Sequence, residues 1–340
     1  MESLKNPPLT TPKRKIYIDW MKAFGMLFII WGHCKLQIFS PFVYAFNVPI
    51  FFVVSGFLTK KDENHNVFFT KLFLNYIVPF IVLAIVKDLK FLFEHTSDGK
   101  FLWSVLAIFG GFHSIGDVAG CLTLWFVYSI MVLKIIFHFI PKNKYIYLLI
   151  ICISTMFTLI YRYFQLKMYW GVTNAIIGLP FFFFGVLLQN YNDYIEKFNE
   201  KGRLIKIISF LLSFVSVWFI ANYNEETYLY KGDCGKNLLF CYLIGFVGTF
   251  GVFALSSIFY KRNLKPILLI SIGTLVILTF HQDVNHPLLK LVNNIGIENL
   301  YLLDIVKLIC SLLSLSLFVP IILIIKKFLP FLIGKRAKSI

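Results

Sequence analysis

Residues Arg14–Phe57 read RKIYIDWMKAFGMLFIIWGHCKLQIFSPFVYAFNVPIFFVVSGF, two apolar runs joined by a turn at Ser40-Pro41. Hydrocarbon disfavours three side chains of the first run, Asp19, Lys22 and His33, so each needs water, a polar partner or a function. Lys22 and His33 are eleven residues apart, which places them on one helix face about 16 Å apart along the axis. The stretch therefore predicts two membrane helices, the first with a polar face.

The composition excludes an ordinary soluble domain. The 340 residues are 58% hydrophobic and 18% aromatic, with a mean hydropathy of +0.76, and long apolar stretches of this kind indicate membrane spans. The net charge of +16 comes from short basic segments between apolar runs, which is typical of a membrane protein and not of a nucleic-acid-binding face. The six cysteines lack ligand spacing, so we expect neither a disulfide framework nor a metal site.

Ten apolar runs are long enough to cross a bilayer, which takes about 20 residues of helix. The sequence thus predicts an all-α polytopic membrane protein whose ten or so transmembrane helices form one bundle. The runs lie near residues 16–38, 42–59, 70–94, 121–140, 145–164, 172–190, 204–221, 237–259, 266–283 and 301–325. The segment 101–112 is too short to span and is interpreted as interfacial or re-entrant.

Lysine and arginine are unevenly distributed between alternate loops of this topology. With the N-terminus inside, the cytoplasmic segments hold 21 of these residues and the outer segments 7, the asymmetry that the positive-inside rule describes. Both termini are therefore expected in the cytoplasm. They form short tails at residues 1–12 and 331–340, on either side of one membrane domain at 13–330.

The topology also assigns depths to the polar residues. The first and ninth helices both run outward, so His33 and the segment 281–283 share a depth near the outer side. Asn47 and Pro49 open the second helix from outside, and proline there frees a carbonyl that protein or water must satisfy. Near the other end of that helix, Ser55-Gly56 offers a small surface on which another helix can pack closely.

Each polar residue has a structural interpretation beside the functional one. His33 could be a hydrogen-bonded residue between helices, His281 an ordinary interfacial histidine, and Lys22 a side chain that extends to the headgroups. A histidine pair at one depth, with a lysine on the same helix face, favours a functional site. Asp19 is interpreted as an orienting partner of Lys22 or Arg14.

The order of these residues resembles a known family. The chain has Asp19, then Lys22 three residues later, then ten residues before His33, and then the segment NVPIFFVVSGF. This order resembles the opening of the acyltransferase-3 family of integral membrane O-acyltransferases, most of all its fucose 4-O-acetylase-like branch. Further matches extend the resemblance over nearly the whole membrane region. They are VPF (78–80), LWFVYSI (124–130), FFFFGVLL (181–188) and SIGTLVILTFH (271–281).

The resemblance implies transfer of an acyl group, usually acetyl, to a hydroxyl of a surface glycan or lipid-linked sugar at a bacterial inner or plasma membrane. The donor is cytoplasmic acyl-CoA (acetyl-CoA), a co-substrate, with no bound cofactor. Lys22 would serve at the donor and His33 would be the catalytic histidine, with Asp19 beside them. The candidates for acceptor binding are His281, Asp283, Asn47, Ser55 and Trp125.

One departure from the family pattern concerns the CoA phosphates. Members often carry two arginines three apart before the proline of the third helix, where this chain has Phe73 and Tyr76. The substitutes expected to bind the phosphates are Arg14, Lys60, Lys61 and Lys71.

Two chemical routes fit an imidazole, whose ordinary pKa near 6.5 suits proton removal. His33 could deprotonate the acceptor hydroxyl for direct attack on the thioester, or could carry the acyl group transiently itself. Two other functions stay open. A glycan or lipid transporter would show paired broken helices and midplane charges, and in a non-catalytic membrane subunit His33 would be dispensable.

Overall fold

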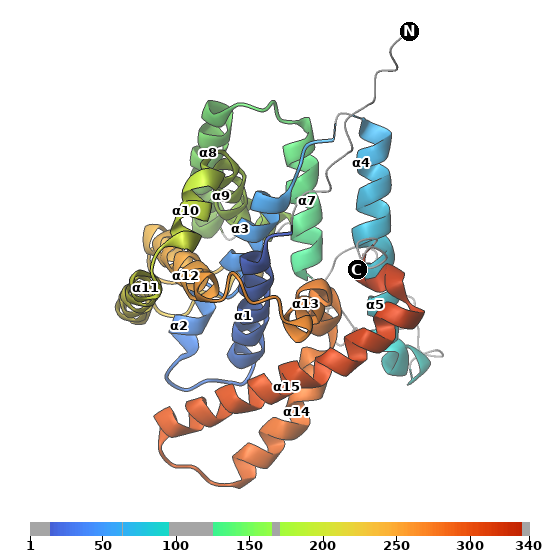
Figure 1. The fold of residues 1–340 in the computed structure, drawn as a ribbon, viewed down its shortest axis with the longest axis vertical. Helices are drawn as coiled ribbons and strands as arrows, with labels where there is room; N and C mark the ends of the chain where they lie inside the picture. Colours follow the sequence, from blue (N-terminus) through green and yellow to red (C-terminus); the bar gives the residue numbers. More distant parts are fainter. Residues whose placement is uncertain (1–13, 63, 95–124, 165–170, 335–340) are drawn as a thin grey trace.

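The computed structural model describes residues 14–62, 64–94, 125–164 and 171–334, and within these ranges it contains helices and no strand. Figure 1 shows the arrangement. The predicted segment 101–112 and the tail 1–12 lie outside the described residues. The helices are α1 (Ile16–Gly32), α2 (Ser40–Tyr44), α3 (Pro49–Leu58), α4 (His65–Leu72), α5 (Val78–Glu94), α7 (Trp125–Phe139), α8 (Lys144–Phe164), α9 (Val172–Leu188), α10 (Asn192–Glu200), α11 (Arg203–Asn224), α12 (Leu238–Ile258), α13 (Lys265–Ile272), α14 (Thr274–Asn294) and α15 (Leu300–Phe328).

Several of these helices can cross a membrane. In the described part of the chain, seven continuous helical stretches are long and apolar enough, three of them made of consecutive elements (Ser40–Leu58, His65–Lys87 and Val172–Glu200), and the number is eight if α13 and α14 count as one span. The all-helical, multi-pass character is thereby confirmed, while the number ten stays a prediction. Each of the ten predicted runs overlaps a helix, but α1 has 17 residues and α7 has 15. The predicted ninth span, 266–283, is not straight, because α13 and α14 meet at 92°.

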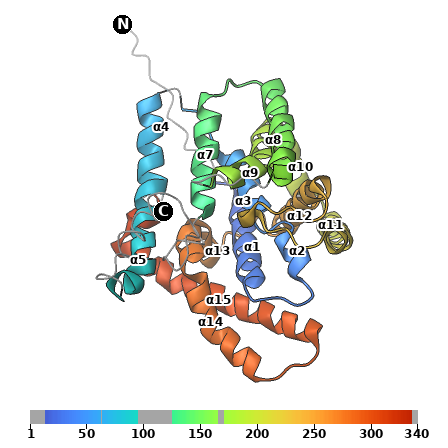
Figure 2. The ribbon, with the colours of Figure 1, turned by 180° about the vertical axis from the view of Figure 1, so that it is seen from behind.

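Helix α1 forms the centre of the molecule. All of its residues are buried except Ile16, Lys22 and Phe24. It contacts α12, α13, α14 and α15 as well as α2 and α3, and both views show it surrounded by them (Figures 1 and 2). A helix that is apolar on nearly every side is expected in such a place. Its polar residues are consequently held by protein.

The two ends of α1 meet different sets of loops. At the Arg14 end, Lys15 forms an ion pair with Glu196 of α10 at 2.8 Å, and the Trp20 indole N–H donates to the Arg262 carbonyl at 3.0 Å. At the His33 end lie the α14–α15 turn and the segments joining α1 to α2 and α11 to α12. Segments that are far apart in the sequence therefore meet at each end of α1.

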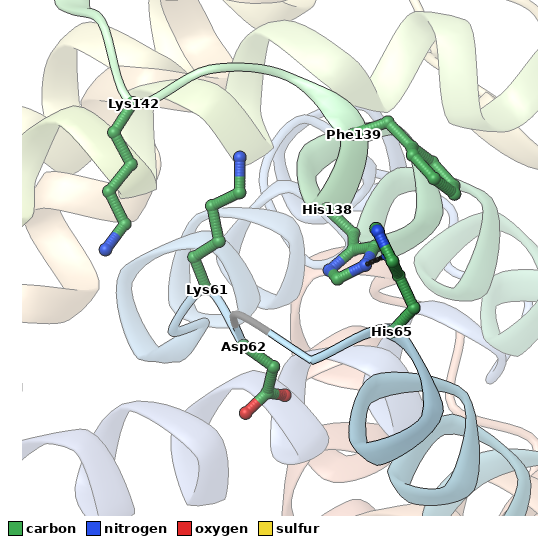
Figure 3. Close-up of a pocket in the computed structure, with 6 residues that line it drawn as sticks. All are labelled: Lys61, Asp62, His65, His138, Phe139 and Lys142. Atoms are coloured by element: carbon green, nitrogen blue, oxygen red, sulfur yellow. Dashed lines mark hydrogen bonds between the residues drawn. The ribbon is translucent and has the colours of Figure 1, made fainter.

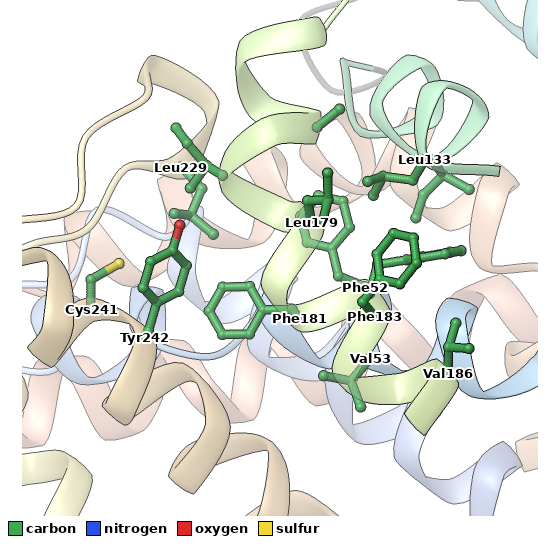
Figure 4. Close-up of a cluster of buried hydrophobic side chains, with 14 of the residues drawn as sticks. Phe52, Val53, Leu133, Leu179, Phe181, Phe183, Val186, Leu229, Cys241 and Tyr242 are labelled. Atoms are coloured by element: carbon green, nitrogen blue, oxygen red, sulfur yellow. The ribbon is translucent and has the colours of Figure 1, made fainter. Parts of the chain in front are cut away.

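Helices α3 and α9 approach each other through two glycines. A Cβ atom on Gly56 would lie 1.9 Å from the Phe182 carbonyl oxygen, and one on Gly185 would lie 2.1 Å from the Val53 carbonyl oxygen. The neighbouring atoms are backbone and cannot rotate away. This confirms the close packing predicted at Ser55-Gly56, and it sets α3 against the hydrophobic cluster of α7, α9 and α12 shown in Figure 4.

We expect Gly56→Ala to destabilise the protein by at least the 1–3 kcal/mol that is typical of overpacking. The two backbones must separate to admit the methyl group. The measurement is the melting temperature of the purified protein in detergent. Gly202→Ala is the matched control, because nothing lies within 4 Å of a Cβ there. Equal melting temperatures for the two variants would contradict the close approach.

Candidate functional site

His33 and His281 come together at the end of α1. Their ring centroids are 4.8 Å apart and the rings are inclined by 51°. His33 follows the last residue of α1 and is exposed, whereas His281 is fully buried in α14. The structure therefore brings together the two histidines that the sequence places at one depth.

Hydrogen bonds define the proton position on His281. Its Nδ1 lies 2.9 Å from the Leu278 carbonyl oxygen and 3.2 Å from that of Ile277. A carbonyl only accepts, so Nδ1 carries the proton and Nε2 of the neutral ring is left as an acceptor. Among the described residues, this buried Nε2 atom has no hydrogen-bond partner. An unsatisfied buried atom costs free energy and is common at functional sites.

Gln282 is a third member of the group. The Nε2 nitrogen of its side-chain amide lies 3.2 Å from Nδ1 of His33. The oxygen and nitrogen of an amide can exchange places by a flip that leaves the ring position unchanged. With the oxygen toward His33, the amide accepts from Nδ1–H and leaves a lone pair on Nε2. The sequence alone assigns Gln282 no role.

A buried ion pair supports the loop after His33. The Asp304 carboxylate accepts three consecutive backbone N–H groups, those of residues 37–39, at 2.8–3.2 Å. Lys307, one turn later on α15, lies 3.5 Å from Asp304 and donates to the Lys35 carbonyl at 2.8 Å. Both side chains are almost fully buried. This pair is not among the residues singled out from the sequence, although two charged residues inside an apolar run indicate it.

A polar chain fastens the same region to α14 and α15. The Asn285 amide donates to Sγ of Cys34 at 3.0 Å, and its oxygen accepts from the Ser314 hydroxyl at 2.8 Å. Sγ of Cys34 also lies 3.3 Å from the Ser311 hydroxyl. The segment that follows His33 is therefore hydrogen-bonded to α14 and α15, although the His33 ring itself is exposed.

The Arg14 end of α1 holds the other predicted residues of that helix. Asp19 forms an ion pair with Arg14 at 2.7 Å and accepts from the Ser271 hydroxyl at 2.6 Å. Asp19 thus pairs with Arg14, one of the two partners predicted for it. Lys22 is half-buried, and its distance from His33 along the continuous helix is about 16 Å.

The predicted acceptor residues are spread more widely. Asn47 is buried against Gly32, next to His33, with its Oδ1 unpaired among the described residues. Asp283 instead forms an ion pair with Lys87 of α5.

Ser55 lies near the opposite end of α3, beside the Gly56 contact, and Trp125 is buried in the cluster of α7 and α9. Only His281 and Asn47 of this set are placed beside the end of α1.

The predicted phosphate-binding lysines lie at the Arg14 end. Lys60 is exposed, Lys71 forms an ion pair with Asp62, and Lys61 lines a cavity with residues of α4 and α7. Within the described ranges, no three His, Cys, Asp or Glu side chains are grouped so that they could hold a metal ion.

Comparison with known proteins identifies the family. A family model described as an acyltransferase domain matches residues 15–325, nearly the whole chain. No curated protein and no solved structure matches. The fucose 4-O-acetylase-like branch stays a prediction. The motif from Asp19 to Phe57, the multi-pass helical fold and this match agree, and the chain belongs to the acyltransferase-3 family.

Proposed function

We propose that this membrane acyltransferase is an O-acetyltransferase, which moves acetyl from cytoplasmic acetyl-CoA to a hydroxyl of a surface glycan or lipid-linked sugar. The observation that carries the proposal is the group at the end of α1. An exposed imidazole has one ring nitrogen oriented by Gln282, beside the buried Nε2 acceptor of His281. This arrangement suits a base that acts on an alcohol.

The chemistry follows from the hydrogen bonds. Nε2 of His33 takes the proton of the acceptor hydroxyl as its oxygen attacks the thioester carbonyl. The C–O ester bond forms, the C–S bond breaks, and the proton passes from His33 to the departing thiolate of CoA. Nε2 of His281 accepts a hydrogen bond from a second hydroxyl of the sugar and orients it. An acyl-histidine intermediate is the alternative route, and CoA release before the acceptor binds would identify it.

The proposed orientation sets the two substrates on opposite sides. The Arg14 end, rich in lysine and arginine, faces the cytoplasm and the His33 end faces outward. Both termini are then cytoplasmic, and ten spans cross a bacterial inner or plasma membrane. Acyl-CoA is anionic and approaches the basic end, and Lys22 lies between that end and His33. The pantetheine arm would extend about 16 Å along α1 from Lys22.

The test is transfer of labelled acetyl in inverted membrane vesicles, where added acetyl-CoA meets the cytoplasmic face. Vesicles containing the protein are expected to incorporate label into the glycan or lipid-linked sugar fraction, and hydroxylamine should release it as expected of an ester. Equal incorporation with and without the protein would refute the O-acetyltransferase assignment.

Gln282→Leu is expected to lower kcat by about three- to tenfold with KM unchanged, because one neutral hydrogen bond is worth about 0.5–1.5 kcal/mol. Gln282→Glu should retain most activity, since a carboxylate oxygen can accept from Nδ1–H of His33. Steady-state kinetics with acetyl-CoA provide the measurement. If the Leu and Glu variants lose activity equally, the proposed amide orientation is wrong.

A further inference from the structure

A cavity of about 410 Å³ lies at the Arg14 end, between the loop that joins α3 to α4 and the loop that joins α7 to α8. Six residues line it: Lys61, Asp62, His65, His138, Phe139 and Lys142. Figure 3 shows the two lysines on one side and the two histidines on the other. Four nitrogen-bearing side chains thus surround a space large enough for a phosphate group.

The charge of this cavity is positive. Asp62 provides the one carboxylate among the lining residues, and it is paired with Lys71 outside the cavity. Lys61 is held by a hydrogen bond from Nζ to the Ile140 carbonyl at 2.5 Å, which leaves two of its three N–H donors for a ligand. Lys142 is exposed on the neighbouring loop. Two ammonium groups and one neutralised carboxylate favour an anion.

The histidine pair provides a second, independent sign of a ligand. Nδ1 of His65 lies 2.7 Å from Nε2 of His138, so one ring donates to the other. His138 is 4% exposed and stacks on Phe68 with centroids 3.9 Å apart. Its Nδ1 is buried and has no partner among the described residues. If His65 donates, this Nδ1 carries a proton and needs an acceptor oxygen, which a bound anion supplies.

We propose that this cavity binds phosphate groups of the acyl-CoA donor, through Lys61 and Lys142 with Nδ1–H of His138 as a further donor and His65 as the residue that fixes the His138 tautomer. The inference rests on the proposed function and extends it to residues His65, His138 and Lys142. The nucleotide end of CoA carries a diphosphate and a phosphomonoester, the anions that ammonium groups bind with strong charge-assisted hydrogen bonds. The cavity lies at the end proposed to face the cytoplasm, where the donor is found.

The test is binding of CoA to the purified full-length protein in detergent, measured by calorimetry. Lys142→Ala is expected to weaken binding by about tenfold or more, because a hydrogen bond to a charged group is worth about 1.5–3 kcal/mol. Lys144→Ala is the matched control, two residues away and not in the cavity lining. It should bind CoA like the unmodified protein. Both lysines are exposed, so neither substitution threatens folding.

A donor without phosphates separates this inference from the proposed function. Transfer from S-acetylpantetheine should be equal for the unmodified protein and Lys142→Ala, whereas the KM for acetyl-CoA should rise about tenfold at unchanged kcat. If CoA binds equally to both proteins, the cavity assignment fails and the proposed function stands. If the unmodified protein neither binds CoA nor transfers acetyl, both fail.

The same variants distinguish the donor from a lipid headgroup. Nanodiscs with and without phosphatidylglycerol show whether anionic lipid stabilises the protein without CoA. Stabilisation that Lys142→Ala abolishes, together with unchanged CoA affinity, would assign the cavity to lipid phosphate and overturn the proposal. Unchanged lipid stabilisation with weakened CoA binding supports it.

Discussion

His33→Ala is expected to lower acetyl transfer by about 10²–10⁴-fold, the usual contribution of a general base. The side chain is exposed, so its removal leaves little packing defect, and the supporting contacts of the loop are made by Asp304 and Asn285 with other residues. The measurement is incorporation of labelled acetyl from acetyl-CoA, with the melting temperature as a check on folding.

His286→Ala is the matched control for this result. His286 is an exposed histidine on the same helix as His281, and its replacement should leave transfer unchanged. His33→Ala should also bind CoA with normal affinity, since the proposed phosphate contacts lie at the other end of α1. Transfer at the normal rate by a folded His33→Ala protein would exclude this residue as the base and would revive the non-catalytic or transporter interpretations.

Asp304→Ala is expected to destabilise the protein by about 3–5 kcal/mol, the cost of removing one partner of a buried ion pair. Lys307 would be left charged at 4% exposure of its side chain, and the N–H groups of residues 37–39 would lose their acceptor. The expected readouts are a lower melting temperature and a loss of transfer, since residues 37–39 belong to the loop that follows His33.

Two further variants make this result specific. Glu298→Ala removes an exposed carboxylate from the α14–α15 turn and should change neither stability nor transfer. The double variant Asp304→Asn/Lys307→Met removes both buried charges and should recover part of the stability lost in Asp304→Ala. If Asp304→Ala melts at the normal temperature, the carboxylate does not support the loop.

The sequence predicts the helices well but not their directions. Apolar runs locate the long apolar helices, because burial in lipid or protein requires such segments, whereas the polar helix α10 (Asn192–Glu200) lies in none of the predicted runs. The 92° bend between α13 and α14 leaves no trace in hydropathy, since the run continues through it. Packing decides it: a Cβ on Gly273 would lie 2.3 Å from a methyl carbon of Ile322. A contact between residues far apart in sequence is invisible to a local pattern.

In the candidate site, too, the sequence predicts some features and leaves out others. The order of the helices and the loop charges predict one depth for His33 and His281, and the structure adds that their rings are 4.8 Å apart. Depth does not give the direction in which a side chain points, so Gln282 and the Asp304 carboxylate were missed. The sequence also does not predict that Lys142 and Lys61 line one cavity. Their two loops come together only when α3, α4 and α7 have packed.

The Asp304 contact also bears on how the protein is made. His33 is synthesised within the first tenth of the chain, but the carboxylate that orders the loop behind it leaves the ribosome near the end. The first helix can enter the bilayer early, yet the loop at its His33 end acquires its final conformation only after α15 is in place. A chain that ends before residue 300 would therefore contain His33 but lack the carboxylate that orders the loop after it.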